Sequence, residues 1–435
     1  MQRLVSTIAL LAVLGGLVGY IYYLETKDPA PPEDAPQKAF ASVEADAIEE
    51  LRITAGGETT RLTKTGNTWS IVEPVRADAD ASEVSSITGS LSSLQIEQVV
   101  DEKPADLAPF GLDPARIDVA FKVKGQAAEQ RILLGEKTPV GENVYAKLPA
   151  SPRVFLVPSH LDPTFNKTTF ALRDKAVLKV ERGKADGLEL KTGSTEIALA
   201  KSGESWSLVK PIAARADYAA VEGAIERLSS AQMQALAEDQ NAPPKRYGFD
   251  APTATMTIKS GSSSATLTLG KTENAVVFAK DSNRPAIFTV APTLRADVVK
   301  DVGEFRRKDL FDFRSFTATR VEFTRGGQTQ AFDRTKGKDG KDVWTVAGKT
   351  LDAMQVESLL AQVSGLRAAS FETGSHASLK TPVLAVKAVF DKGSDSVTFG
   401  RAGADVYASR SDEPGTAKLD AAAFDEAIKA LDALK

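Results

Sequence analysis

The longest uncharged stretch of the chain runs from Leu4 to Leu24, near the amino terminus. A helix of this length, at 1.5 Å per residue, spans about 31 Å, which is enough to cross the hydrocarbon core of a bilayer. Arg3 precedes the stretch, and a positive charge there favours an amino terminus inside the cell. The pattern therefore predicts a transmembrane signal anchor over residues 1–24, with the membrane contacted through residues 4–24.

A cleaved signal peptide is the alternative for the same segment. Its apolar region would be shorter, and it would end in small residues at the cleavage site. Here the stretch ends in Tyr20-Ile-Tyr-Tyr-Leu24, and the next small candidate, Ala30, is followed by Pro31. These features favour an uncleaved anchor.

Residues 25–39 change the pattern to four prolines and no large apolar side chain. Such a composition predicts an extended, Pro-rich stalk. We therefore expect a single-pass protein of the cytoplasmic (inner) membrane, with the bulk of the chain, from residue 40 onward, on the periplasmic or extracytoplasmic side.

Beyond the stalk, one pattern of apolar and polar positions recurs three times. Trp69, Trp206 and Trp344 are its markers, and the motif Lys64-Thr-Gly-Asn-Thr-Trp69 matches Lys201-Ser-Gly-Glu-Ser-Trp206. Each tryptophan lies in an alternating segment that predicts a hairpin. Apolar residues at steps of three and four then predict a helix in each copy. These apolar residues are Val84, Ile87, Leu91 and Leu94 in the first copy, Val221, Ile225 and Leu228 in the second, and Val356, Leu359, Val363 and Leu366 in the third.

An aspartate stands four residues before the leading valine of each predicted helix. Asp80, Asp217 and Asp352 are therefore expected to be N-caps, whose carboxylates accept the free N–H groups of the first turn. Glu83 and Gln355 stand at the position that would complete a capping box.

After the helix, alternating segments predict a meander of about four strands in each copy. One strand ends in glycine each time, at Gly135, Gly270 and Gly400. The step Phe110-Gly-Leu-Asp113 precedes the meander in the first copy, and Tyr247-Gly-Phe-Asp250 precedes it in the second, whereas the third lacks it. The fold class predicted is α+β: three related units at 40–170, 171–309 and 310–435, each a mainly antiparallel sheet with one or more helices.

Composition narrows the chemistry that these units can carry. The chain has 58 acidic and 54 basic residues, a net charge of −4, no cysteine and two histidines. The charge balance argues against a chain-wide nucleic-acid footprint, and the absence of cysteine excludes disulfides and thiolate metal sites. We expect no nucleic-acid partner, no metal, no cofactor and no catalytic residue, hence not an enzyme.

Two charged clusters at the predicted boundaries are the candidate interaction surface. They are Arg173, Asp174 and Lys175, and Arg306, Arg307 and Lys308. They are either solvated linkers or contact surfaces, in which arginine pairs with carboxylates of a neighbouring unit or of a partner. The tryptophans are expected in the core, because each shares a strand face with an apolar residue two positions later. Stacking on sugars is the alternative.

The anchor, the stalk, the Trp-containing hairpins, the Phe/Tyr-Gly-x-Asp step and the Arg-Asp-Lys junction together resemble the bacterial family called domain of unknown function 4340. The resemblance covers most of the chain as repeated copies. It implies an accessory role beside an ABC-type transport system similar to those linked to gliding motility, and it assigns no catalytic residue.

These observations predict a non-enzymatic, membrane-anchored scaffold or accessory protein with a protein partner in a membrane transport or motility complex. One alternative is an envelope module that binds a glycan or another ligand. The other is a hydrolase that uses paired carboxylates, since the many acidic residues offer spatial pairs that sequence does not exclude.

Overall fold

The computed structural model describes residues 37–41, 43–238, 243–337, 340, 342–391 and 393–434. The predicted anchor and nearly all of the predicted stalk lie outside these residues. No helix within the described ranges is both long and apolar enough to cross a membrane. The chain divides into two compact units, one ending at Asp174 and the other beginning at Lys175.

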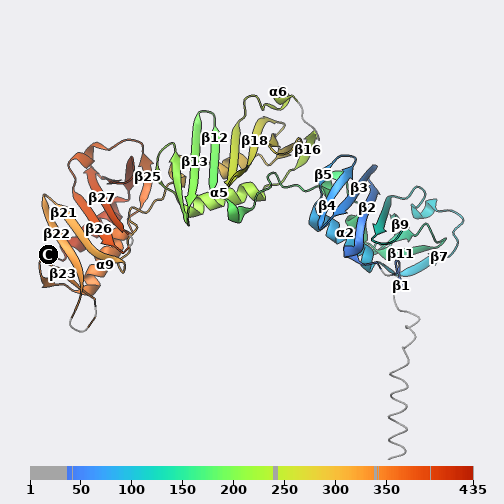
Figure 1. Cartoon of the computed structure of the whole chain (residues 1–435), viewed down its shortest axis with the longest axis horizontal. Helices are drawn as coiled ribbons and strands as arrows, with labels where there is room; N and C mark the ends of the chain where they lie inside the picture. Colours follow the sequence, from blue (N-terminus) through green and yellow to red (C-terminus); the bar gives the residue numbers. More distant parts are fainter. Residues whose placement is uncertain are drawn as a thin grey trace, which may run out of the picture. The chain divides into compact units, whose positions relative to one another are not determined.

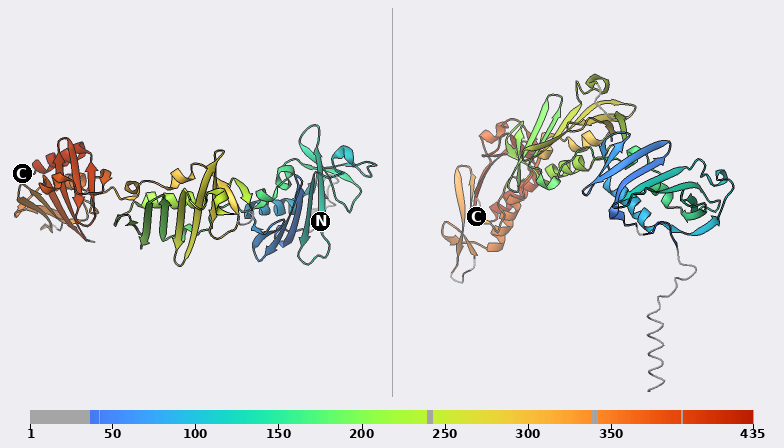
Figure 2. Two further views of the ribbon diagram at one scale, coloured as in Figure 1. Left: turned by 90° about the horizontal axis from the view of Figure 1, so that it is seen from above. Right: turned by 45° about the vertical axis from the view of Figure 1, so that its right-hand side comes forward.

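Three sheets of nine strands form the body of the protein, one in the first unit and two in the second (Figures 1 and 2). The first has the strand order β5-β4-β3-β2-β8-β9-β10-β11-β7, the other two repeat this order, and all neighbouring strands are antiparallel. The predicted α+β class with repeated antiparallel sheets is therefore confirmed. The strands of the first sheet are β2 (Ile48–Ala55), β3 (Glu58–Thr65), β4 (Thr68–Glu73), β5 (Ala77–Asp78), β7 (Gln98–Asp101), β8 (Ile117–Val123), β9 (Gln130–Lys137), β10 (Asn143–Lys147) and β11 (Val154–Pro158).

The second and third sheets hold the matching strands. Those of the second are β12 (Gly187–Thr192), β13 (Thr195–Ser202), β14 (Ser205–Lys210), β15 (Ala214–Arg215), β16 (Ala235–Glu238), β17 (Ala254–Ser260), β18 (Ser263–Glu273), β19 (Val276–Asp281) and β20 (Ile287–Val290). Those of the third are β21 (Ala318–Arg325), β22 (Gln328–Lys336), β23 (Asp342–Val346), β24 (Lys349–Thr350), β25 (Ala368–Glu372), β26 (Leu384–Phe390), β27 (Gly393–Ala402), β28 (Asp405–Arg410) and β29 (Thr416–Leu419). A separate short pair joins β1 (Gln37–Lys38) to β6 (Gln95–Ile96).

Each sheet has one principal helix between its edge strands, and further helices follow it; these are short except for α10 (Ala421–Asp432), which has 12 residues, as α9 does. Figure 1 shows α5 lying along one face of the sheet that contains β12, β13 and β18. The principal helices are α2 (Ala81–Ser93), α5 (Tyr218–Ser230) and α9 (Ala353–Ser364). The others are α3 (Leu161–Phe165), α4 (Thr169–Leu172), α6 (Pro244–Tyr247), α7 (Leu294–Val298), α8 (Val302–Phe305) and α10 (Ala421–Asp432), with 3-10 turns η1 (Ala45–Ala47), η2 (Ala108–Phe110), η3 (Arg182–Lys184) and η4 (Ala377–Lys380).

The predicted helix caps are confirmed, but the predicted capping box at Glu83 is wrong. The Asp80 carboxylate accepts the N–H groups of Ser82 and Glu83, and the aligned aspartates cap α5 and α9 by accepting the N–H of Ala220 and of Gln355. The N–H of Asp80, which a capping box would satisfy, donates instead to the carbonyl of Leu172, and the Glu83 side chain pairs with Lys167. A tertiary contact therefore replaces the local one.

The predicted hairpin before each helix is a four-stranded meander, and a further edge strand follows the helix. In the first sheet these are β2 to β5 and then β7, which pairs with β11 at the opposite edge from β5. Strands as short as β5, with only two residues, are too short to show an alternating pattern. The sequence pattern therefore underestimates the size of each sheet.

The three marker glycines lie inside strands and not at strand ends. A Cβ on Gly135 would lie 2.0 Å from the carbonyl oxygen of Phe110, and one on Gly270 would lie 2.0 Å from that of Tyr247. The Phe/Tyr-Gly-x-Asp step forms a short helical turn that sits directly on the strand, so no side chain fits beneath it. In the third copy, η4 takes this place, and Ser378 crowds Gly400.

The tryptophans pack against the hydrophobic cores. Trp206 and Trp344 are 3% and 1% exposed, and Trp69 is half-buried against the first core. The indole N–H of Trp206 donates to the Glu222 carboxylate at 2.9 Å. This position leaves little of the Trp206 and Trp344 rings for stacking on a ligand.

Candidate functional site at the junction of the second and third sheets

The candidate site is the segment that leads from the second sheet into the third, residues 306–314, with the side chains packed on it. Its backbone pairs on both sides. Arg306 forms a β-bridge with Ala216 beside β15, and Asp309 forms one with Arg367 just before β25. The segment is therefore a short strand shared by two repeats.

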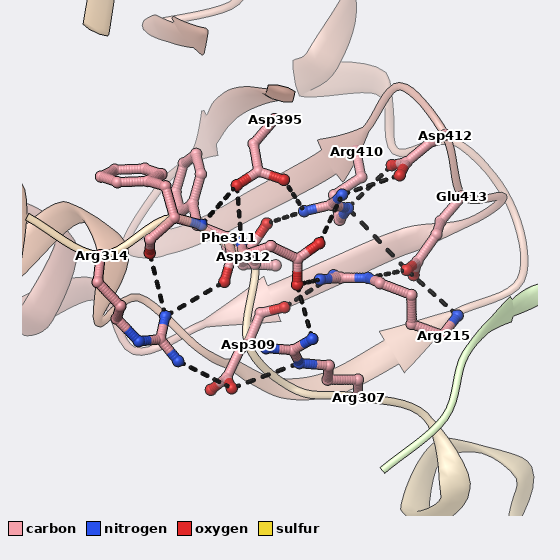
Figure 3. Close-up of polar contacts among 12 residues, drawn as sticks. Arg215, Arg307, Asp309, Phe311, Asp312, Arg314, Asp395, Arg410, Asp412 and Glu413 are labelled. Carbon is pink, nitrogen blue, oxygen red and sulfur yellow. Dashed lines mark hydrogen bonds and ion pairs between the residues drawn. The ribbon is translucent and has the colours of Figure 1, made fainter. Parts of the chain in front are cut away.

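Arg215, at the end of β15, extends the guanidinium from the second sheet into the third repeat (Figure 3). Its Nη1 lies 2.7 Å from Asp312 Oδ1, and its Nε lies 2.5 Å from Glu413 Oε1. Its Nη2 donates to the carbonyl of Asp309 at 2.8 Å. One side chain thus contacts two carboxylates and a backbone carbonyl, and the planar fork of arginine donors suits such a set.

Arg306 is buried at the same junction. Its Nη2 lies 3.2 Å from Glu413 Oε2 and donates to the carbonyl of Pro414 at 3.1 Å. The guanidinium also lies 4.0 Å from the centre of the Phe371 ring, in a cation–π contact. Since the Arg306 side chain is 5% exposed and that of Glu413 is 6% exposed, solvent screens this pair weakly.

A second buried pair lies in the third repeat. Arg410, the last residue of β28, has Nη1 3.0 Å from Asp395 Oδ1, and their side chains are 4% and 1% exposed. The other Asp395 oxygen accepts the N–H groups of Asp312 and Phe313, at 2.7 and 3.0 Å. Arg410 also donates to the carbonyl of Leu310 at 2.6 Å. The pair therefore holds the backbone of the junction segment.

The charges of this cluster shift two ionisation equilibria. Burial by itself lowers the pKa of Arg410, but hydrogen bonds to Asp412 and the charges of Asp395, Asp412 and Asp312 outweigh burial and raise that pKa. The hydrogen bond from Arg410 likewise lowers the pKa of Asp412, against a smaller opposing effect of burial. Both shifts favour the charged forms at neutral pH.

Further arginines complete the cluster around Asp309 and Asp312. Arg307 Nη1 lies 2.6 Å from Asp312 Oδ1, and Arg367 Nε lies 3.1 Å from Asp309 Oδ1. Each of the five carboxylates in the cluster contacts at least one guanidinium. The cluster is therefore a network in which guanidinium groups donate and carboxylates accept.

A cleft of about 840 Å³ opens beside the cluster. Aromatic, hydroxyl and charged side chains line it, from β14, β15 and the start of α5 on one side and from the third repeat on the other. Among its aromatic residues, Tyr218 is 55% exposed, and Lys201 Nζ lies 5.6 Å from the centre of its ring. The lining includes Ser205, Trp206, Ser207, Arg215, Tyr218, Arg307, Asp309, Asp312, Phe390, Ser394, Arg410 and Asp412.

The predicted interaction residues occupy two kinds of place. Arg306 and Arg307 belong to the cluster, whereas Lys308 pairs with Glu304 at 3.4 Å toward solvent. At the first junction, Arg173 is buried and forms a β-bridge with Ala79. Its neighbours use their backbones: the N–H of Asp174 donates to Asp78, and the carbonyl of Lys175 accepts from Met233.

Sequence reasoning missed the other members of the cluster. They are Arg215, Asp309, Asp312, Arg367, Asp395, Arg410, Asp412 and Glu413. A signal was present, because Arg215 stands where the first copy has Asp78, and Arg410 stands where the second copy has Asp281. At these two positions the copies carry opposite charges, and in both cases the arginine belongs to the junction cluster.

Comparison with known proteins gives one family. The model described as "Domain of unknown function (DUF4340)" matches residues 69–207 and 206–384. No curated protein matches the sequence. The DNA polymerase sliding clamp from Pseudomonas aeruginosa has 8% identity over 88% of this chain and 93% of the clamp, with a TM-score of 0.16. The DNA polymerase III subunit beta from Borrelia burgdorferi has 7% identity over 87% and 92%, with a TM-score of 0.17. Likenesses this weak carry no argument about the chain.

Proposed function

The chain belongs to the family described as Domain of unknown function (DUF4340), and from this premise we propose that it is a membrane-anchored, non-catalytic scaffold of the cell envelope. In this proposal, residues 4–24 anchor the protein in the cytoplasmic membrane, residues 25–39 form a stalk, and the three repeats present binding surfaces outside it. The partner is a protein of an ABC-type transport or gliding-motility-like complex.

The junction between the second and third repeats is the observation that carries the proposal. There a set of buried and half-buried charged side chains connects two repeats, through Arg215 and Arg306 on Glu413 and through Arg215 on Asp312. A buried ion pair of this kind fixes geometry more than it adds stability. Repeats that are held together by ion pairs in this way are suited to position partner proteins.

Crosslinking and affinity capture test this proposal. The full-length protein, in gently solubilised native membranes, is compared with a variant that lacks residues 1–39. We expect the full-length protein to recover a defined membrane-protein partner. Loss of the partner from the shortened variant would assign binding to the membrane region, and retention would assign it to the repeats. Recovery of the protein alone from both, with crosslinking also blank, would overturn the proposal.

A second candidate function is binding of an envelope ligand or glycan in the junction cleft. The exposed ring of Tyr218, beside Trp206 in a cleft of about 840 Å³, favours it. Titration with soluble envelope glycans, followed by tryptophan fluorescence, tests it. Saturable quenching that Tyr218→Ala abolishes would support this function, provided that Phe316→Ala, at a 72% exposed ring outside the cleft, leaves the quenching unchanged. Unchanged fluorescence at every ligand would exclude it.

A further inference from the structure

The first two repeats each hold an extended segment at the same place, beside the edge strand that precedes the principal helix. In the second repeat, the N–H of Asp217 donates to the carbonyl of Phe305 at 2.8 Å, and the carbonyl of Arg215 accepts from Arg307 at 2.9 Å. These two bonds flank the bridge between Ala216 and Arg306. The segment thus adds to the sheet edge by backbone pairing.

The first repeat uses the same geometry. The N–H of Asp80 donates to the carbonyl of Leu172, and the carbonyl of Asp78 accepts from Asp174, both at 2.9 Å. The bridge between Ala79 and Arg173 lies between these bonds. Two independent copies therefore define what this edge binds, namely an extended segment that carries a large apolar residue at its start.

In the third repeat, Thr350, Leu351 and Asp352 hold the equivalent positions. The N–H of Leu351 donates to the Trp344 carbonyl, as the N–H of Ala216 does to the Trp206 carbonyl, so the local register is the same. Within the described ranges, no backbone group pairs with the Thr350 carbonyl or the Asp352 N–H from outside the sheet.

Exposure of these residues agrees with an uncovered edge. Thr350 and Asp352 are exposed and Leu351 is half-buried, whereas the aligned Arg215 and Asp217 of the second repeat are half-buried and Ala216 is 7% exposed. An unpaired edge of this kind is a template for strand addition.

A large apolar side chain stands exposed beside this edge. Met354, in the first turn of α9, is 79% exposed and lies two residues beyond Asp352. Its flexible thioether side chain suits contact with an incoming apolar residue.

We propose that the edge at Thr350–Asp352 docks an extended segment of a partner protein by β-augmentation, with a large apolar residue of that segment beside Met354. The proposal rests on the scaffold function and names the surface that the partner uses. The two internal junctions, in which the same edge pairs with an extended segment, indicate that the docked segment is extended.

A second copy of this chain could not pair with this edge through the segment that leads into its first repeat. Ala39, Val177 and Leu310 are aligned, because the N–H of each donates to the carbonyl at the end of the principal helix or just after it, at Leu94, Ala231 and Leu366. Three positions earlier, at the internal junctions, stand Asp174 and Arg307, whose N–H groups pair with the preceding repeat. The residue three positions before Ala39 is Pro36. Proline has no N–H to donate to Thr350. This excludes the entry segment of a second copy as the occupant, and the proposal commits to a different protein.

Site-specific photocrosslinking tests the docking surface. The full-length protein in native membranes carries a photoreactive phenylalanine derivative at Met354 or, as a matched control, at Val140, which is 88% exposed in the first unit. We expect a crosslinked product at position 354 only, mapped by mass spectrometry to one extended segment of another protein. The amide of Asp352 should exchange with solvent faster than those of Asp80 and Asp217 in the free protein, and it should become protected in the complex.

A second experiment introduces a negative charge at position 354. Met354→Glu should lower capture of the partner at least fivefold, and Val140→Glu should not. A partner that is captured equally well by Met354→Glu would overturn the docking surface and leave the scaffold function intact. Crosslinks at position 354 only to lipid or to a second copy would do the same, and recovery of no partner by any form would overturn both proposals.

Discussion

Arg215 on the edge strand of the second sheet and Glu413 in the third repeat form a direct ion pair, with Arg215 Nε 2.5 Å from Glu413 Oε1. The other Glu413 oxygen lies 3.2 Å from Arg306 Nη2. One carboxylate therefore neutralises two arginines that approach it from the second repeat and from the junction segment. Because Glu413 is nearly buried, this contact depends on its charge more than a surface pair would.

Glu413→Gln should destabilise the second unit. The substitution keeps the shape of the side chain but leaves Arg306 and Arg215 without that charge, and loss of one partner of a buried pair costs about 3–5 kcal/mol. Urea unfolding of the purified chain, followed by tryptophan fluorescence, should show a lower midpoint. Glu304→Gln is the control, because its pair with Lys308 is largely exposed and should contribute less than about 1 kcal/mol. Equal midpoints for the two variants would contradict this role of Glu413.

Arg410 and Asp395 should behave as a coupled pair. Arg410→Met leaves the buried Asp395 carboxylate without its ion-pair partner, and Asp395→Asn removes the most buried of the carboxylates that contact Arg410, so each single substitution is costly. The double variant removes both charges, and we expect it to be less destabilised than the sum of the singles by about 0.5–3 kcal/mol. A double-mutant cycle from the same unfolding measurement checks this coupling. Strict additivity would show that the pair does not act as a unit.

Local features of the fold could be predicted from sequence, because they depend on residues close together along the chain. The spacing of Trp69, Trp206 and Trp344 predicted the repetition, and the aspartates before each helix predicted the caps. Alternation predicted antiparallel strands, although the shortest edge strands were missed. Each of these features is set within a few residues.

The junction could not be predicted, because its contacts join residues far apart in sequence. Arg215 contacts Asp312 and Glu413, which are 97 and 198 residues away. No periodicity indicates which of the acidic residues a given arginine meets. The sequence marked Arg306 and Arg307 as charged residues at a boundary, but their partners became identifiable only from the paired sheets.

Acid should weaken the contact between Trp206 and Glu222. Burial raises the pKa of Glu222, but hydrogen bonds from Trp206 and Lys201 outweigh burial, so the folded pKa is lowered. The stabilisation is therefore complete above the unfolded pKa of about 4.3 and is lost as the pH falls further through the folded value. Tryptophan fluorescence of the folded chain between about pH 6 and pH 2 should report this loss. Glu222→Gln should remove this pH-dependent contribution, and a profile that the substitution leaves unchanged would contradict the assignment.

The same substitution at two glycines should have effects of opposite sign. A Cβ on Gly270 would lie 2.0 Å from the Tyr247 carbonyl, so Gly270→Ala must displace α6 from the strand. Such overpacking costs about 1–3 kcal/mol. Gly89 lies inside α2, and an added Cβ there would meet no atom within 4 Å, so Gly89→Ala should stabilise the helix by about 0.5–1 kcal/mol. Thermal unfolding of both variants measures the two shifts, and a neutral Gly270→Ala would show that the turn moves freely over β18.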